Sequence, residues 1–253
     1  MRLNKALALD PKHSRTHGIV GNVLARSGKL DEAIVRFQTA LELNPRYREA
    51  HTDLGRILRD GGRLTEATVH FRAVVELDDK DPLGHFELGN ILLQRGMSDE
   101  AVQQLQRTLA LDPRSIDAHL SLSKAFVAKG DFRSAVAQLQ KATAVDANNV
   151  RPVADLAWLL AVCPQADVRD GAKAVGLAKR ACAVTGYKNP VLLNTLAAAY
   201  AEQGDFSAAV TTATSALRLV TPQDAVLAQS IRENLEGYRA GKPCRPLPKS
   251  SSN

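Results

Sequence analysis

Four histidines in the first half of the chain stand at equal intervals: His17, His51, His85 and His119 are each 34 residues apart. Imidazole nitrogen is a common ligand of zinc, so an evenly spaced set of histidines raises the question of a metal site. Zinc needs its ligand nitrogens about 2.0–2.1 Å from one ion. Whether the four rings can meet at such a point depends on the elements that carry them.

The same interval organises residues that have no side-chain chemistry of their own. Glycine recurs at Gly28, Gly62, Gly96 and Gly130, and alanine recurs at Ala33, Ala67, Ala101 and Ala135. Because glycine makes up about 7% of average sequence, three further matches at a preset spacing have a chance of about 3 × 10⁻⁴. The chain is therefore a tandem repeat, and the histidines belong to its architecture.

Each repeat is predicted to hold two helices joined by a tight turn. In the first helix, apolar or small residues lie three or four positions apart, as in Leu54, Gly55 and Leu58, which places them on one face. The turn glycine, such as Gly28, accepts the left-handed conformation that often ends a helix. The expected side-chain caps of the second helices are Asp31, Thr65 and Asp99, and the prolines expected to end them are Pro45 and Pro113.

Small residues at the crossing of the two helices decide what the histidines can do. Gly21, Gly55 and Gly89 on the first helices allow the helix axes to approach within about 8–10 Å. Equivalent residues of successive repeats are separated by at least such a packing distance, so the histidines form a ladder and cannot share one ion. We therefore expect each ring to fill space between the two helices of its own repeat.

The Leu-Gly pairs at 54–55 and 88–89, followed at fixed offsets by the turn glycine, the alanine, Phe37 and Pro45 or their equivalents, resemble the tetratricopeptide repeat. The resemblance covers nearly all of the chain up to residue 223. It implies an all-α fold, a right-handed α-solenoid of antiparallel helix pairs, with a concave groove that binds peptides.

The period divides the chain into units, one of which is longer than the others. Pro164 and Arg169 stand where the next turn glycine and alanine are expected, and the pattern resumes at Gly204 and Ala209. Residues 1–13 match only a second helix, which indicates a fragment of a longer array or an unusual starting point. The predicted division is a partial repeat at 1–13, regular repeats at 14–47, 48–81, 82–115 and 116–149, an irregular repeat with an insertion at 150–189, a regular repeat at 190–223, a C-terminal capping helix at 224–240 and a disordered tail at 241–253.

Residues 150–245 also resemble the C-terminal end of tetratricopeptide arrays in large bacterial proteins. The likeness is carried by the sequences Ala-Trp-Leu-Leu-Ala at 157–161, Thr-Leu-Ala-Ala-Ala-Tyr-Ala-Glu at 195–202 and Tyr-Arg-Ala-Gly-Lys-Pro at 238–243. Some of those arrays are fused to membrane-bound glycosyltransferase-like domains or to kinases. This resemblance gives an alternative function, in which the chain is the substrate-recruiting C-terminal portion of a larger enzyme.

The net charge of +6 and the isoelectric point of about 9.3 invite a nucleic-acid partner, but the distribution of charge argues against one. Lys242, Arg245 and Lys249 place +3 in the last residues of the chain, which leaves 6 − 3 = +3 for all the rest. Nonspecific binding of nucleic acid stays open only as a third hypothesis.

The remaining composition favours a non-catalytic chain. Three cysteines, an odd number without metal-ligand spacing, indicate buried or free thiols in a reducing compartment, and so a cytoplasmic location unless the chain belongs to a larger membrane protein. No apolar run approaches the roughly 18 residues that cross a bilayer. The sequence lacks a phosphate-binding glycine loop, a nucleophile elbow and a paired-cysteine metal signature, so we expect no enzyme activity, no cofactor and no metal.

The concave wall is where the resemblance places partner contacts. In the family, the first helices build it at positions three before and one, four and five after the residue equivalent to Gly55. The groove residues carried over to this chain are Asn22, Arg26, Arg56, Arg59, Phe86, Asn90, Leu93, Leu120, Lys124 and Trp158. The expected partner is a protein or peptide with acidic groups near the arginines and apolar groups near the aromatic and leucine side chains.

Alternatives to this groove stay open. The arginines could form a solvated face, and Trp158 could pack against the insertion at 163–171. Two family subtypes do not transfer: a chaperone-tail clamp needs lysine where Gly18 stands, and the asparagine ladder of sugar-transferase arrays needs asparagine where Asp53 and Glu87 stand. The sequence predicts a scaffold that binds an extended or helical segment of a partner. It also predicts that the double substitution Arg56→Glu with Arg59→Glu weakens partner capture without lowering the melting temperature.

Overall fold

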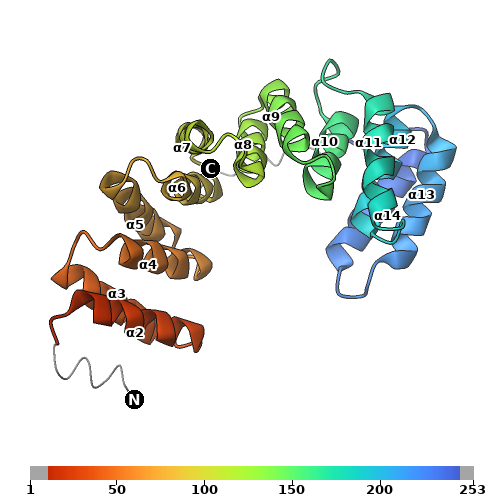
Figure 1. The fold of residues 1–253 in the computed structure, drawn as a ribbon. Helices are drawn as coiled ribbons and strands as arrows, with labels where there is room; N and C mark the ends of the chain where they lie inside the picture. The colour runs from red at the N-terminus through yellow and green to blue at the C-terminus, as the bar shows by residue number, and fades with distance from the viewer. Residues whose placement is uncertain (1–10, 246–253) are drawn as a thin grey trace. The chain divides into compact units, whose positions relative to one another are not determined.

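The computed structural model describes residues 11–245. Within this range every regular element is an α-helix and no strand occurs, so the predicted all-α class is confirmed. No helix in this range is long and apolar enough to cross a membrane. The helices are α2 (Ser14–Arg26), α3 (Leu30–Leu43), α4 (Arg48–Asp60), α5 (Leu64–Leu77), α6 (Pro82–Gln94), α7 (Ser98–Leu111), α8 (Ile116–Ala128), α9 (Phe132–Val145), α10 (Val150–Val162), α11 (Gly171–Val184), α12 (Pro190–Glu202), α13 (Phe206–Leu219) and α14 (Ala225–Arg239) (Figure 1).

The chain forms two compact units, one up to Lys129 and one from Gly130 onward. In the first unit, α2 packs on α3, α4 on α5 and α6 on α7, and the short turns within these pairs make the partners antiparallel. In the second unit, α9 packs on α10, α10 on α11 and α12 on α13. The exact repeat boundaries remain our proposal, and most of the predicted partial repeat at 1–13 lies outside the described residues.

Glycine ends the first helices α2, α4 and α6 as predicted. Gly28, Gly62 and Gly96 have φ of 77°, 77° and 76°, in the left-handed region. At the end of α2, the amide of Gly28 donates to the carbonyl of Ala25 and that of Lys29 to the carbonyl of Leu24, both at 3.0 Å. These two bonds form a Schellman motif, which satisfies carbonyls at the helix end that would otherwise lack a partner.

The capping role predicted for Asp31, Thr65 and Asp99 is wrong. Helices α3, α5 and α7 begin two residues earlier than this role requires, so the three side chains lie inside the first turn. The residues that do stand at the cap positions make no side-chain cap hydrogen bond. Asp31 and Asp99 instead place negative charge near a helix N-terminus, where the helix dipole favours it.

The close helix crossings that the small residues predicted are present. A β-carbon on Gly55 would lie 3.1 Å from the Phe71 ring, and one on Gly89 would lie 2.7 Å from Cγ of Leu105. Phe71 and Leu105 are both fully buried. The glycines therefore make room for the large core side chains of the second helices.

Helix α14 closes the second unit, as the sequence predicted for a capping helix. It packs on α13 and α12 through Ala228, Ile231, Leu235 and Tyr238, all of which are buried. Its charged Arg232, Glu233 and Glu236 are exposed. This division into an apolar and a charged face covers the core at the end of the array.

Candidate partner-binding wall

The four periodic histidines hold the turns that precede their own helices. Their Nε2 atoms lie close to the carbonyl oxygen of the residue six positions earlier, at 3.0 Å for His17 to Pro11, 3.0 Å for His51 to Pro45, 3.0 Å for His85 to Asp79 and 3.2 Å for His119 to Pro113. Because a carbonyl oxygen only accepts, each Nε2 carries the proton and donates it. Across residues 11–245, no group of three or more His, Cys, Asp or Glu side chains could hold a metal ion.

In His51 and His85, the second ring nitrogen reaches the other helix of the same pair, which is the packing role expected from the sequence. Nδ1 of His85 lies 2.8 Å from the side-chain amide of Gln104 on α7, and because the ring proton is on Nε2, the amide NH2 is the donor to Nδ1. Nδ1 of His51 lies 3.0 Å from Nδ1 of His70 on α5, with the ring centroids 5.2 Å apart. Two imidazoles that face each other in this way share one proton, so a second proton disrupts the contact. Burial, and then the nearby His51, lowers the pKa of His70 to about 4.

We expect His70→Gln to flatten the pH dependence of stability between about pH 6.5 and pH 4. The pKa of His70 is lower in the folded chain than its usual 6.5, so the unfolded chain binds more protons in this window and the wild type loses stability as the pH falls. Each unit of pKa corresponds to about 1.4 kcal/mol, and solvent screening of this half-exposed ring reduces the total effect to about 1 kcal/mol. Gln104, the equivalent residue of the next repeat, shows that glutamine fits this place.

Urea unfolding of both proteins at about pH 7 and about pH 4.5 measures this difference. The wild type should lose about 1 kcal/mol more than His70→Gln between the two conditions. Equal losses would show that the histidine pair does not couple folding to pH.

The first helices of the first unit lie side by side and form a continuous layer. Helix α2 contacts α4, and α6 contacts α8. Side-chain hydrogen bonds link α2 to α4 and α4 to α6. We call this layer the first-helix wall. It carries nine of the ten predicted groove residues, and the tenth, Trp158, lies on α10 in the second unit.

Glu87 on α6 accepts hydrogen bonds from both of the arginines that were predicted to bind an acidic partner. Nε of Arg56 donates to Oε1 of Glu87 at 2.9 Å, and Nη1 of Arg59 donates to Oε2 at 2.6 Å. The Glu87 side chain is only 11% exposed. Such charge-assisted bonds to a nearly buried carboxylate are among the stronger polar contacts in a protein. The two guanidinium groups are therefore already engaged within the chain.

A second hydrogen bond at the equivalent position shows that this contact recurs between neighbouring repeats. Nδ2 of Asn22 on α2 donates to Oδ2 of Asp53 on α4 at 2.8 Å. Asn22 and Arg56 are equivalent residues, and each bonds a carboxylate 31 positions later in the chain. Asp53 and Glu87 were noted in the sequence only as departures from an asparagine ladder, and their pairing was missed. The recurrence of an acid at this offset was the signal that could have found it.

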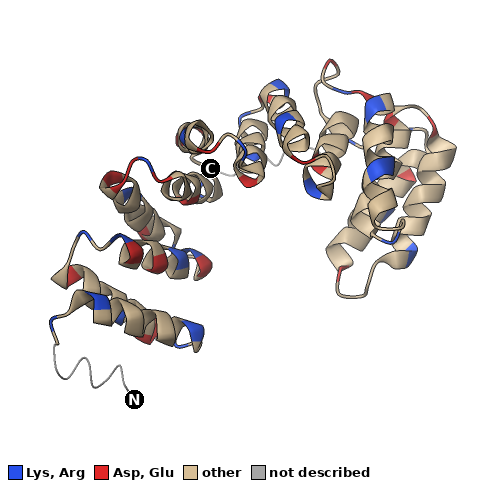
Figure 2. Cartoon of the chain, in the orientation of Figure 1, with Lys and Arg blue, Asp and Glu red and all other residues tan. Residues whose placement is uncertain are grey.

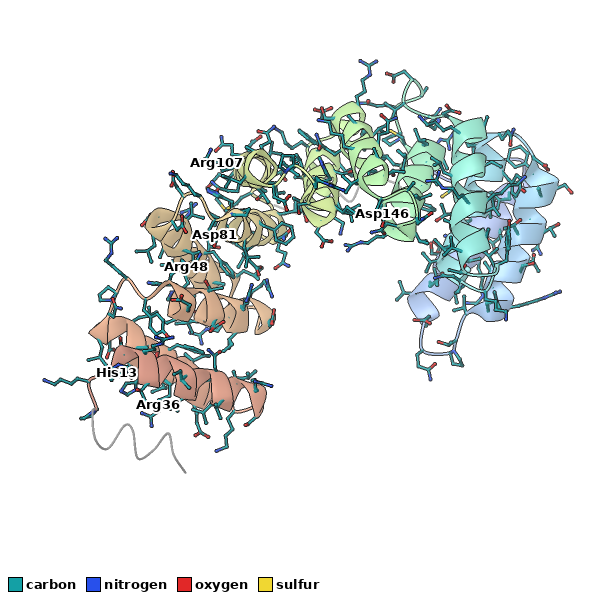
Figure 3. The ribbon with its side chains drawn as sticks, viewed as in Figure 1. His13, Arg36, Arg48, Asp81, Arg107 and Asp146 are labelled. Atoms are coloured by element: carbon teal, nitrogen blue, oxygen red, sulfur yellow. The ribbon has the colours of Figure 1, made fainter. Side chains whose placement is uncertain are left out.

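A cavity of about 190 Å³ lies beside these contacts. Its lining combines positive and negative side chains from α4, from α6 and from the N-cap of α6, among them Arg48, Asp53, Arg56, Asp81 and Glu87. Nη1 of Arg48 donates to Oδ2 of Asp81 at 2.5 Å (Figure 3). Blue and red segments accordingly occur together along α4 (Figure 2). The wall is thus a mixed-charge surface, whereas the sequence led us to expect a partner's acidic groups near its arginines.

The remaining predicted groove residues differ in their access to solvent. Leu120 is buried, with 2% of its surface exposed, so it cannot serve as the apolar anchor expected from the sequence. Phe86 and Leu93 are partly buried against the core of the first unit. Asn90 and Trp158 are also half-buried, and Asn22, Arg26 and Lys124 are exposed. Arg26 and Lys124 are the predicted cationic residues that remain accessible.

Together, the helix pairs and the continuous wall define a helical-repeat protein that displays the side chains of its first helices. Sequence comparison identifies the family: models of the tetratricopeptide repeat match residues 20–82, 92–160 and 190–213. The chain belongs to the tetratricopeptide repeat family. A comparison with curated proteins gives no match.

Solved structures of several bacterial and other proteins are similar in fold. PilF of Pseudomonas aeruginosa is 18% identical with a TM-score of 0.67, over 88% of this chain and 98% of its own. MamA of Desulfovibrio magneticus RS-1 is 16% identical with a TM-score of 0.63, over 69% of this chain and 96% of its own. YrrB is 15% identical with a TM-score of 0.56, over 92% and 98%. At these identities the likeness concerns the fold alone.

Proposed function

We propose that this chain is a non-catalytic scaffold that binds an extended or helical segment of a partner protein along the first-helix wall. Its membership in the tetratricopeptide repeat family supports protein interaction in general terms. YrrB is described as a tetratricopeptide repeat protein with an unusual peptide-binding site, which agrees with a peptide as the ligand class. The observation that carries the proposal is the continuous layer of first helices, with exposed polar groups beside a mixed-charge cavity.

The hydrogen bonds from Arg56 and Arg59 to Glu87 limit where the acidic groups of a partner can bind. A partner carboxylate at Arg56 or Arg59 would compete with Glu87 for the same guanidinium groups. Arg26 and Lys124 are exposed, and they have no ion pair within residues 11–245. We therefore place the acidic contacts of the partner at Arg26 and Lys124, and its apolar contacts at the accessible edges of Phe86 and Leu93.

Charge reversal at these two cations tests the proposal. We expect Arg26→Glu with Lys124→Glu to reduce partner capture at least ten-fold, because each reversal replaces attraction by repulsion across the interface. A matched control is Lys141→Glu with Arg180→Glu, which makes the same change in net charge at exposed positions of the second helices α9 and α11. Affinity capture with quantitative mass spectrometry compares both variants with the wild type.

Partners that depend on the wall should be lost from the first variant and kept by the control. Equal recovery by all three proteins would place binding elsewhere on the chain. Equal loss from both variants would show that only net charge matters.

A further inference from the structure

In the second unit, Glu202 at the end of α12 accepts hydrogen bonds from two guanidinium groups that come from distant parts of the chain. Nε of Arg169 donates to Oε1 of Glu202 at 2.8 Å, and Nη2 of Arg245 donates to Oε2. The Glu202 side chain is 13% exposed. Arg169 belongs to the insertion that breaks the period, and its Nη1 also donates to the carbonyls of Cys163 at 2.9 Å and Pro164 at 3.1 Å. The insertion therefore fixes the position of one guanidinium beside Glu202.

The second guanidinium comes from the C-terminal segment. After α14, Gly241 adopts φ of 68°, and the amide of Lys242 donates to the carbonyl of Gly237 at 2.9 Å. Sγ of Cys244 donates to Oδ1 of Asn234 at 3.1 Å. Residues 241–245 are thus ordered against the helices, whereas the sequence predicted a disordered tail from residue 241. Residues 246–253 of that predicted tail lie outside the described residues.

The contacts of Arg245 fall on the layer of first helices in this unit. Besides Glu202, its Nη1 lies 3.4 Å from the carbonyl oxygen of Ala161 at the C-terminal end of α10. Helices α10 and α12 are the first helices of their pairs and contact each other. Ala161 and Glu202 stand at the positions four and five after the small residue of the crossing, which are the positions that face a partner in the family. The chain's own C-terminal segment therefore lies where a partner is expected.

We propose that the first-helix layer of the second unit is a receptor for an extended segment that carries an arginine, and that residues 242–245 occupy it as an internal ligand. This inference rests on the proposed function, because it treats the layer of first helices as a surface for partner segments. The guanidinium of Arg245 is divided between a carboxylate and backbone carbonyls. A planar guanidinium donates in these separate directions at once, and a lysine ammonium does not reproduce this arrangement.

The internal ligand also regulates access to the layer. A tethered segment competes at an effective concentration in the millimolar range, so a partner displaces it only by binding more tightly than the lone arginine does. Loss of the Arg245 contact is therefore expected to open the layer to an external segment of the same chemistry.

A fluorescent peptide with the sequence of residues 241–249, Gly-Lys-Pro-Cys-Arg-Pro-Leu-Pro-Lys, is the probe. We expect the full-length Arg245→Ala variant to bind this probe about ten-fold more tightly than the wild type in fluorescence anisotropy, because the competing internal contact is gone. Adding Glu202→Gln should return the affinity to the wild-type level or below. Adding Glu236→Gln, the same charge change at an exposed residue of α14, should leave the affinity of Arg245→Ala unchanged.

Equal affinity of the probe for the wild type and Arg245→Ala overturns the proposal, as does absence of binding to Arg245→Ala. Indifference to Glu202→Gln, or equal binding of a probe whose arginine is replaced by alanine, does so too. Melting curves show whether each variant is folded, and Glu202→Gln keeps the volume of the side chain. Capture through Arg26 and Lys124 involves the first unit only, so it can succeed or fail independently of these results.

Discussion

Arg56→Glu combined with Arg59→Glu is expected to destabilise the first unit by about 3 kcal/mol. In the wild type, two guanidinium groups surround the carboxylate of Glu87, whose side chain is 11% exposed. The double variant gathers three carboxylates at this point and leaves Glu87 without its partners. Breaking a buried ion pair from one side typically costs about 3–5 kcal/mol, and the partial exposure of Arg56 places this case at the lower end. Urea unfolding followed by circular dichroism measures the loss.

Exchanging the charges of the arginines and Glu87 distinguishes the loss of this ion pair from a general effect of added negative charge on stability. Adding Glu87→Arg to the double variant restores opposite charges at the contact, and we expect it to recover about half of the lost stability. Arg26→Glu alone changes an exposed residue of the same layer and should alter stability by less than about 0.5 kcal/mol. Wild-type stability of the double variant, or no recovery in the triple variant, would show that the contact contributes little.

This expectation replaces the one drawn from the sequence, in which the same double variant affected capture alone. The family resemblance places Arg56 and Arg59 on the concave wall because it assigns positions within one helix. It does not specify which residues of a neighbouring helix lie opposite. The structure brings Glu87 to within 2.6–2.9 Å of both arginines, so their first role is to join α4 to α6. A variant of these residues therefore cannot report on partner binding alone.

Features that depend on local geometry could be predicted well. Glycine at Gly28, Gly62 and Gly96 ends a helix for a reason confined to a few residues, and all three have the left-handed φ that was expected. Gly55 and Gly89 likewise predicted a close crossing, because a residue without a side chain at the same place in successive helices leaves room for a neighbour. These features fix the class of fold. The start of a second helix was misjudged by two residues, since acidic residues such as Asp31 and Asp99 stabilise a helix from its first turn as well as from its cap.

Contacts across repeats could be predicted only where they recur. The bonds from Asn22 to Asp53 and from Arg56 to Glu87 span the same number of positions, so a comparison of the two would have indicated the register of neighbouring first helices. The cluster around Glu202 has no such precedent. Arg169 lies in an insertion and Arg245 beyond the last repeat, and their contacts with Glu202 span 33 and 43 positions. The irregular parts of this chain meet where the period gives no information.

Gly171→Ala is expected to destabilise the second unit by about 1–3 kcal/mol, whereas Gly176→Ala in the same helix should stabilise it by about 0.5–1 kcal/mol. A β-carbon on Gly171, the first residue of α11, would lie 2.7 Å from the amide nitrogen of Gln203 and 3.0 Å from the carbonyl carbon of Glu202. These are backbone atoms, which cannot rotate away, so α11 must move from the end of α12 and disturb the contact between Arg169 and Glu202. A β-carbon on Gly176 meets nothing within 4 Å, and alanine there gains helix propensity without a clash. In urea unfolding, Gly176→Ala should be more stable than the wild type and Gly171→Ala should be less stable. A loss of stability in both variants would contradict this explanation. It would mean that α11 does not tolerate alanine at either position, so the close approach of Gly171 to α12 would not be the cause.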